Sequence, residues 1–491
     1  MQYLDLYITS FFLVIVIAYF LYVFFKDKNK EKRWAFFIAQ VFLTTTSGIM
    51  IANINFNKMN EIFKGNTIIL SIMMIIGSWV LFYAIFKFVY GYLSIKFNNR
   101  KDFIKYSNLF LIIAILLFFI QTENNFVLIT IFIIQAILIG ACLGVQSSYF
   151  LYFNEQKFNK NFPLKVSFIL GTTISLAYLT SNLLISLVHI IPSDAYFIEL
   201  YSPIVLVIIS FILSFFLKEY PDKIGGFSNR IIHQMAPYKK NILVKMIILT
   251  ITLSIIYTSL QSPFIKMYII AELKSKGASY FFLNAIDRQY TIMFFVPHLI
   301  LGYIIFKIFN NKINLNYALI LVLGLMSLTL LVNTFYLNAI LLIISNIIFG
   351  SVLFTLMYFW MSFALMWNSR AKQKPILGWV TGSFVLSQFL ITTLFNYVIL
   401  LDNSIFIVKS SSEIISPELI DLENFKNKLS IFLKLVFAIM FVVNCIYIII
   451  IFMWSKTIIA EYEDVNFMIQ KMYKIEKQRI ENKINKRMVE D

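Results

Sequence analysis

Long apolar runs dominate this chain of 491 residues. Each run is long enough to cross the hydrocarbon core of a bilayer, which takes about 20 residues of α-helix. Barrel strands are excluded because the runs lack period-two alternation and are far too long. The sequence therefore predicts an all-α integral membrane protein with about 13 spans. The predicted spans are 6–25, 34–55, 67–94, 103–121, 126–153, 166–190, 200–217, 242–270, 279–306, 314–333, 338–367, 376–401 and 429–455.

The composition agrees with a membrane protein. Hydrophobic residues make up 60% of the chain and charged residues 14%, whereas soluble domains average about 45–50% apolar and about 25% charged residues. The two cysteines, Cys142 and Cys445, lie in apolar runs and form neither a disulfide framework nor a metal site. The first run follows Asp5 without a basic residue or a small-residue cleavage site, so it is expected to be a retained helix rather than a signal peptide.

The basic residues sort to one side of the predicted membrane. If the loop "KDKNKEKR" is cytoplasmic, alternate loops on that side hold most of the Lys and Arg, and the opposite segment 402–428 is net acidic. The N-terminus is therefore expected outside and the C-terminus inside. This topology accounts for most of the net charge of +17, so no nucleic acid is expected as a partner. Richness in Lys, Asn, Ile and Phe is typical of an AT-rich genome, and a bacterial plasma membrane is the expected location.

Two nearly identical segments divide the chain. "GYLSIKFNNRK" at 91–101 and "GYIIFKIFNNK" at 302–312 each end a long apolar run in a cytoplasmic loop. Counted from the span 34–55, one follows the second helix and the other the eighth, which indicates two sets of six helices. The predicted units are an extra helix with its loop at 1–33, a bundle at 34–217, a linker at 218–241, a bundle at 242–455 and a tail at 456–491.

This organisation resembles the major facilitator superfamily, whose loop after the second helix reads Gly-x-Leu-x-Asp-Arg-x-Gly-Arg-Lys. The matching positions here are Gly91, Leu93, Lys96 and Arg100 in the first segment and Gly302, Lys307 and Lys312 in the second. Ile95 replaces the acid and the second segment also lacks one, so the charge relay attributed to this motif cannot operate in the usual way. The glycines are expected to let two helices approach closely at the cytoplasmic end.

The resemblance implies two six-helix bundles in pseudo-twofold repeat that move a small solute by alternating access, with no enzymatic activity and no cofactor or metal. It also implies a monomer, and a cavity lined by the first, fourth, seventh and tenth helices. Polar and aromatic residues of those helices are the candidates for solute binding: Gln40, Asn53, Gln146, Tyr257, Gln261 and Trp360. The same residues could instead join helices to one another in lipid.

The candidate set favours a neutral polar solute, such as a sugar or a nucleoside, with efflux of an amphiphile or drug as the next choice. The family's organophosphate antiporters clamp phosphate with an Arg in the first helix and another in the seventh. The spans 34–55 and 242–270 contain no Arg. An organophosphate antiporter is therefore ranked below a carrier of neutral solutes.

Two ionisable residues occupy equivalent positions in the repeat. Lys87 precedes Lys96 by the same spacing at which His298 precedes Lys307. Ionisable groups inside a membrane are costly and mark functional sites by default, which favours a cytoplasmic-side gate or an anion contact. The alternatives are a lysine that reaches the interface with its ammonium group and a histidine that is hydrogen-bonded in packing.

Asp287 and Arg288 are expected in the outer third of the span 279–306. Lys266 could pair with Asp287, and the sequence leaves open an outer gate, a proton-coupling carboxylate or a structural pair. Protons are therefore a candidate coupling ion. Pro263 is expected to bend the span 242–270 because it removes a backbone donor and clashes one turn back.

Two rival classes complete the predictions. A lipid-directed enzyme lacks support because His189, His233 and His298 show neither metal spacing nor a carboxylate dyad. A transporter-like sensor or assembly anchor, acting through the helix 6–25 and the tail, stays open. The basic tail can lie on anionic cytoplasmic lipid as an amphipathic helix, or it can continue the last span as a solvated helix.

Overall fold

In the computed structural model, all the described secondary-structure elements are helices. Outside scattered positions between 7 and 21, the described residues are 32–63, 67–97, 100–120, 122–156, 163–190, 195–218, 240–287, 290, 315–370, 375–401, 411–416 and 421–490. The predicted first span 6–25 and most of the predicted span 279–306 therefore lie outside the described residues.

The helices of the first half pack together. They are α2 (Lys32–Phe63), α3 (Thr67–Ile76), α4 (Trp79–Lys96), α5 (Arg100–Leu116), α6 (Asn125–Gly144), α7 (Gln146–Gln156), α8 (Pro163–Ile190) and α9 (Ala195–Ser214). Helix α2 is central, with α6, α8 and α9 against it, and α4 and α5 both pack on α6. We call this group the N-terminal bundle.

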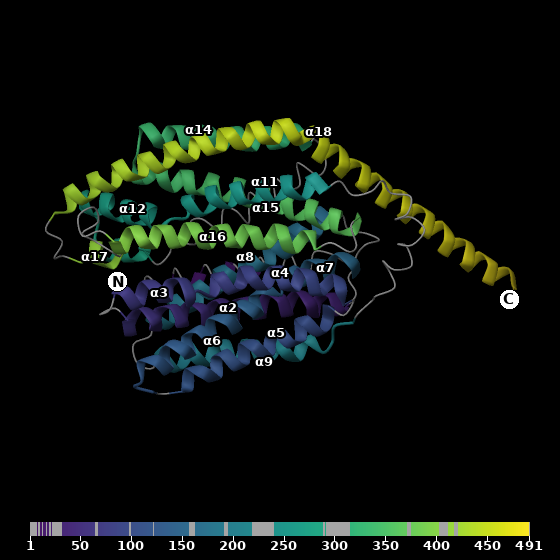
Figure 1. The fold of residues 1–491 in the computed structure, drawn as a ribbon, viewed down its shortest axis with the longest axis horizontal. Coiled ribbons are helices and arrows are strands. Elements are labelled where there is room, and N and C mark those ends of the chain that lie inside the picture. Colours follow the sequence, from purple (N-terminus) through teal and green to yellow (C-terminus); the bar gives the residue numbers. More distant parts are fainter. Residues whose placement is uncertain are drawn as a thin grey trace.

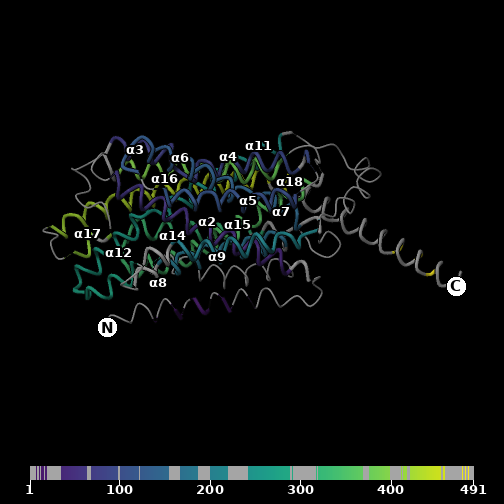
Figure 2. Tube along the Cα trace, turned by 90° about the horizontal axis from the view of Figure 1, so that it is seen from below, coloured from purple at the N-terminus to yellow at the C-terminus, as the bar shows by residue number. Residues whose placement is uncertain are grey.

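The helices of the second half form another group. They are α11 (Lys240–Leu260), α12 (Pro263–Ser275), α14 (Leu315–Phe335), α15 (Ala339–Arg370), α16 (Ile376–Leu401), α17 (Ser411–Ile415) and α18 (Leu422–Glu490). Helix α11 contacts α15, α16 and α18, and α14 packs on α18. Figure 1 shows this C-terminal bundle, in green to yellow, above the purple and blue N-terminal bundle. Figures 1 and 2 both place α12 and α17 at one end of the body and α7 toward the other.

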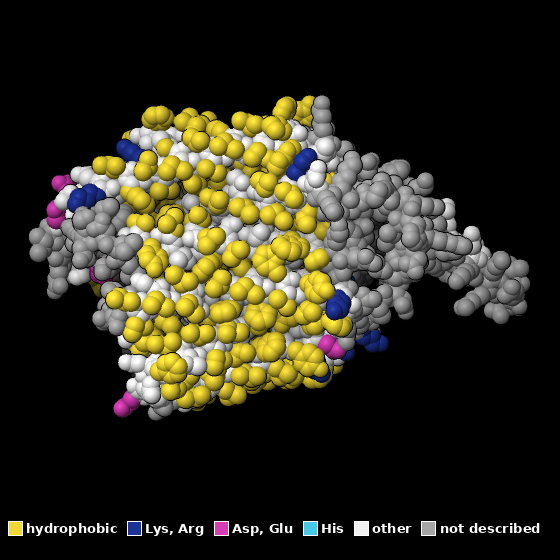
Figure 3. Space-filling view, in the orientation of Figure 1, with side chains coloured by type: hydrophobic (Ala, Val, Ile, Leu, Met, Phe, Trp, Pro, Cys, Tyr) yellow, Lys and Arg dark blue, Asp and Glu magenta, His cyan; other side chains and the backbone are white. Residues whose placement is uncertain are grey.

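The outer surface of the body is apolar. Among the described residues, nine helical segments are long and apolar enough to cross a membrane, and two shorter ones are apolar as well. Hydrophobic side chains cover the face in Figure 3, and charged ones appear toward its two ends. Polar side chains of α2, such as Gln40 and Thr44, are instead fully buried. This distribution fits a lipid environment, in which exposed polar groups find no hydrogen-bond partners.

Three predicted spans are each broken into two helices. The break between α11 and α12 falls at Gln261 and Ser262, and Pro263 takes the first turn of α12, so the predicted bend at Pro263 is confirmed. Proline suits that position because the first backbone N–H of a helix has no intrahelical partner. The other breaks, at Gly77 between α3 and α4 and after Gly144 between α6 and α7, were not expected from the sequence.

The last helix continues past the membrane span. Helix α18 runs without interruption from Leu422 to Glu490 over 69 residues, and Figure 1 shows its final part extending beyond the other helices. The helical backbone of the tail favours the second of the two interpretations above, a helix that prolongs the last span.

Close contact between α4 and α6 depends on glycine. A Cβ added at Gly140 would stand 2.5 Å from Cβ of Phe82 and 2.7 Å from the backbone nitrogen of Tyr83. These distances are far inside van der Waals contact, so the two helix backbones approach as closely as small-residue packing in membranes allows. Gly324 of α14 is the opposite case, because an added Cβ there would meet no atom of the described residues within 4 Å.

The two glycines give a matched test of this packing. We expect Gly140→Ala to destabilise the protein by about 1–3 kcal/mol, because the extra methyl forces α4 and α6 apart. Gly324→Ala should be neutral or stabilise by about 0.5–1 kcal/mol, because alanine loses less backbone entropy in a helix. Thermal unfolding of both variants in the same detergent measures the difference, and equal melting temperatures would contradict the packing described.

Candidate functional site

A cavity of about 400 Å³ lies between the two bundles. Its size falls in the range of about 300–1,000 Å³ that is typical of small-molecule sites. The lining residues come from α4, α7 and α8 on one side and from α11, α12, α15 and α16 on the other. They are Trp79, Val80, Tyr83, Lys87, Gln146, Phe150, Gly171, Ile174, Ser175, Tyr178, Tyr257, Thr258, Gln261, Ser262, Pro263, Phe354, Met357, Met361, Phe384, Val385, Gln388, Thr392, Phe395 and Asn396.

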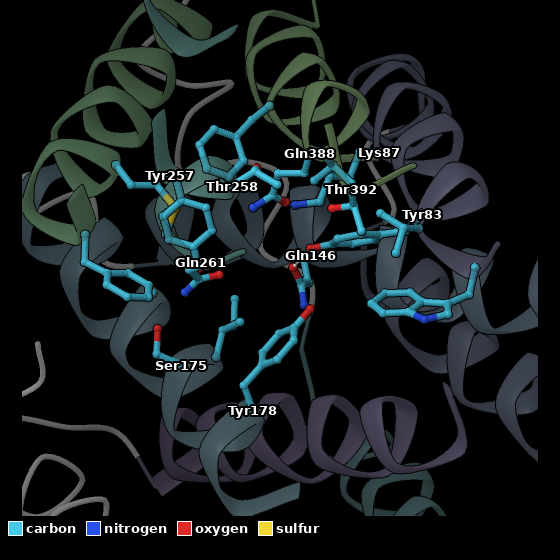
Figure 4. A pocket seen from close by; sticks show the side chains of 18 of the residues that line it. Tyr83, Lys87, Gln146, Ser175, Tyr178, Tyr257, Thr258, Gln261, Gln388 and Thr392 are labelled. Carbon is cyan, nitrogen blue, oxygen red and sulfur yellow. Dashed lines mark hydrogen bonds between the residues drawn. The ribbon is translucent and has the colours of Figure 1, made fainter. Parts of the chain in front are cut away.

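The lining combines aromatic rings with uncharged hydrogen-bonding groups. Figure 4 shows Tyr257 and Gln261 on one side of the cavity, Tyr178 below, and Gln388 and Thr392 above. Tyrosine presents an apolar ring and a polar tip, and a glutamine amide both donates and accepts. Such a surface can hold the face of a ring while hydrogen-bonding the groups at its edge.

Lys87 is the basic residue of the described lining. Its side chain is 2% exposed, and its Nζ lies 4.6 Å from the centre of the Tyr83 ring. Attraction between the ammonium group and the ring face holds the cation at this wall. Glycine makes room beside it, because a Cβ at Gly144 would come within 3.3 Å of the backbone nitrogen of Lys87.

Gln146 presents an unpaired donor to the same region. It is the first residue of α7, directly after the break that follows Gly144, and it is 2% exposed. Its Oε1 accepts a hydrogen bond from the Tyr83 hydroxyl, whereas its Nε2 finds no hydrogen-bond partner among the described residues. A buried amide N–H without a partner is costly. Figure 4 shows Gln146 in the middle of the site, between Tyr178 and the wall that carries Lys87.

At one end of the cavity the two bundles are in close contact through glycines, a Ser–Thr pair and the Phe88 ring. A Cβ at Gly91 of α4 would stand 2.5 Å from Cα of Gly378 in α16, and a Cβ at Gly382 would meet the Phe88 ring at 2.7 Å. Ser147 and Thr381 hydrogen-bond across the same interface, with 3.1 Å between their oxygens. We call these six residues the inter-bundle seal. The expected close approach at Gly91 is confirmed, and the seal lies at the end predicted to be cytoplasmic.

The lining extends away from the seal along α16. It begins at Phe384, about 9 Å beyond Gly378 at 1.5 Å per residue. It ends at Asn396, about 8 Å from the end of the helix at Leu401. The cavity therefore reaches from the middle of the bundle pair toward the end predicted to be extracellular.

The structure brings four of the predicted site residues together. Gln146, Tyr257 and Gln261 line the cavity, as does Lys87. Tyr257 packs its ring edge-on against Phe354, with 5.7 Å between the ring centres. Gln261 lies in the break before Pro263, where the interrupted backbone faces the site.

Three predicted binding residues lie elsewhere. Gln40 donates from Nε2 to the Thr44 hydroxyl at 3.0 Å within α2, and to the Tyr149 hydroxyl of α7 at 3.4 Å. Asn53 donates to Asn182 Oδ1 at 3.5 Å. Trp360 donates from its indole nitrogen to the Tyr447 hydroxyl at 2.6 Å. None of the three is part of the described lining, because their polar groups are used to join helices within a bundle.

The predicted gating and loop residues are also dispersed. Lys266 Nζ lies 2.6 Å from Asp287 Oδ1, so the expected pair is confirmed. Gly91 and Leu93 lie near the end of α4, where exposed Lys96 stands over the rings of Tyr92 and Phe97.

Arg100 begins α5 and is buried. Arg288, His298, Gly302 and Lys307 lie outside the described residues.

Sequence reasoning missed the contributions of α8 and α16, and those of α4 apart from Lys87. Tyr83, Tyr178, Gln388 and Thr392 line the cavity although the expected lining came from other helices. Gln388 and Asn396 carried a usable signal, because amides are rare in an apolar span. Tyrosine carried none, since it is as common at lipid interfaces as in cavities.

Comparisons with known proteins bear on the fold. No family model and no curated protein matches the amino-acid sequence. Among solved structures, the proton:xylose symporter XylE matches with a TM-score of 0.53 and 13% identity, over 86% of this chain and 96% of that one. The chain has the major facilitator fold. The predicted resemblance is thereby confirmed at the level of architecture.

Two further structures share this fold. A bacterial homologue of the iron transporter ferroportin, in an outward-facing state, matches with a TM-score of 0.53 and 12% identity, over 85% of this chain and 98% of that one. The human organic anion transporter MFSD10 matches with a TM-score of 0.52 and 11% identity, over 85% of this chain and 100% of that one.

The described seal predicts one-sided access to the cavity. In a background in which Ala replaces Cys142 and Cys445, we expect Thr392→Cys to react with a membrane-impermeant maleimide added outside. Thr381→Cys, which lies in the seal, should remain unlabelled. Mass spectrometry of labelled spheroplasts measures both. Equal labelling of the two cysteines from outside would contradict closure at Thr381.

Proposed function

We propose that this protein is a transporter that moves a small organic solute across the bacterial plasma membrane by alternating access. The observation that carries the proposal is a cavity lined by both bundles and closed at one end by the inter-bundle seal. A rocking motion of the bundles would open the seal and close the opposite end around a fixed site.

The chemistry of the seal suits repeated opening. Gly91 meets Gly378 backbone to backbone, and Ser147 and Thr381 share a single neutral hydrogen bond. A neutral hydrogen bond contributes only about 0.5–1.5 kcal/mol net. The six residues of the seal carry no charge, so the two bundles can separate here without leaving a charge buried.

The lining supports an organic cargo rather than a metal ion. Within the described residues, no group of three or more His, Cys, Asp or Glu could hold a metal, which disfavours the iron named for the ferroportin homologue. Amides, hydroxyls and aromatic rings suit the predicted sugar or nucleoside and also an amphiphile. The described lining contains no Arg, so an organophosphate antiporter stays below these candidates.

Asp287 is proposed as a structural partner rather than as the proton-coupling group. Its carboxylate pairs with Lys266, and both side chains are about a quarter exposed, at 23% and 26%. Neither residue belongs to the described lining. We expect the Asp287→Asn variant to keep the pH dependence of solute uptake. Loss of that pH dependence would instead support proton coupling through the Asp287–Lys266 pair.

A reversible cross-link tests alternating access. The oxygens of Ser147 and Thr381 are 3.1 Å apart, which places cysteines at these positions within reach of a disulfide. In the background without native cysteines, we expect Ser147→Cys with Thr381→Cys to lose solute flux in proteoliposomes after oxidation, at least ~10-fold, and to regain it with a reductant. Each single variant is the matched control.

The flux assay uses labelled glucose, uridine, galacturonate and indole-3-acetate, so that neutral and acidic solutes are both represented. Transport of any one that responds to the cross-link supports the proposal. If none crosses faster than in empty liposomes, the transport function is refuted. The same assay on a protein that lacks residues 457–491 tests the alternative function as a sensor or assembly anchor. Undiminished solute flux by this truncated protein would argue against that alternative.

A further inference from the structure

We propose that the cavity contains a carboxylate-binding subsite formed by Lys87 and Gln146, so that the cargo is an organic monoanion. This inference rests on the proposed transport function and assigns the chemical class of the solute. It departs from the neutral solute that the sequence favoured, because it accounts for a buried charge and a buried donor that a neutral cargo would leave unused.

No acidic side chain in the described lining balances Lys87. Two acidic residues in apolar spans of the C-terminal bundle have other partners: Glu272 accepts from Lys276 at 2.5 Å and from the backbone N–H of Ala339, and Asp287 pairs with Lys266. The stretch 288–314 has no Asp or Glu in its sequence. Lys87 contacts the Tyr83 ring instead, and a ring face supplies much less stabilisation than a carboxylate.

Hydrogen-bond donors gather beside this cation. Tyr83 touches both partners, since its ring lies under Lys87 Nζ and its hydroxyl donates to Gln146 Oε1. One lone pair of the Gln146 amide oxygen is thus occupied, and its Nε2 finds no hydrogen-bond partner among the described residues. A cation and an orphaned amide donor on one wall are complementary to the oxygens of a carboxylate.

The composition of the lining indicates the charge of the ligand and the kind of group that carries this charge. One lysine and no arginine in the described lining suit a single negative charge rather than a phosphate dianion, for which bidentate arginines are the usual partners. The lining also offers Tyr178 from the N-terminal bundle and Tyr257 from the C-terminal bundle, and Gln388 and Gln261 lie within the same cavity. A carboxylate on a ring therefore fits, whether the ring is aromatic or a sugar.

Matched acid and neutral pairs test the subsite. The full chain in lipid nanodiscs is titrated with indole-3-acetate against indole-3-acetamide, and with galacturonate against galactose. Dissociation constants are obtained from the concentration dependence of the melting temperature. We expect the acid of at least one pair to bind ~10-fold or more tightly than its neutral partner. The pair that shows the preference identifies the body as aromatic or as a sugar.

Three variants separate the subsite from general packing. Lys87→Gln should weaken binding of the preferred acid by ~10-fold or more and leave the neutral partner within ~2-fold. Gln146→Glu keeps an acceptor for Tyr83 and places a carboxylate beside Lys87, so it should reverse the preference toward the neutral solute. Lys105→Gln removes a charge outside the cavity, where Nζ lies 4.0 Å from the Phe215 ring centre, and should retain the preference.

The outcomes are distinct from those of the flux assay. The subsite is overturned if the acids bind no better than their neutral partners, if neither acid binds, or if the preference survives both Lys87→Gln and Gln146→Glu. A neutral solute that binds and is transported would overturn the subsite and leave the transport function standing. Should Lys87→Gln fail to fold, Gln146→Glu still decides the question through the predicted reversal.

Discussion

The hydrogen-bond requirement of the membrane interior determines the rest of this structure. Lipid offers no partner to a backbone or side-chain polar group, so each must be satisfied inside the protein. The N-terminal bundle shows the consequence, because the Thr44 hydroxyl donates to Asn108 Oδ1 at 2.7 Å and Ser210 donates to the same oxygen at 3.2 Å. Polar residues that complete such contacts hold a bundle together. Gln146, whose Nε2 finds no hydrogen-bond partner among the described residues, lines the cavity.

Glycine determines where the helices come closest. Gly140 and Gly144 bring α6 against α4, and Gly91 brings α4 against Gly378 of the other bundle. The two contacts differ in their consequence, because the first lies within one bundle and the second joins two. Gly144 also ends α6, and the break that follows turns Gln146 toward the site. The same close packing thus fixes the wall with Lys87 and forms the seal beside it.

Most of the fold could be predicted from the sequence, and the site only in part. Apolar length locates each described span, and Pro263 announces a break because proline cannot donate within a helix. The ion pair between Lys266 and Asp287 was also predicted from the positions of the two residues in their spans. Gln40 and Trp360 show the limit, since a polar group in an apolar span can face either a cavity or another helix. Only the placement of Tyr149 and Tyr447 beside them decides between the two.

Lys87 illustrates why a buried charge says more about a cavity than its neutral residues do. An amide or hydroxyl can be satisfied by a neighbouring helix at small cost, whereas a charge at membrane depth costs about 2.5–3.5 kcal/mol on insertion scales. Lys87 nevertheless points its ammonium group at a tyrosine ring in a site shared by both bundles. A bound anion would supply the missing countercharge and fill the donor of Gln146. Because both groups lie beside the seal, a ligand that engages them would bind at the point where the two bundles must separate.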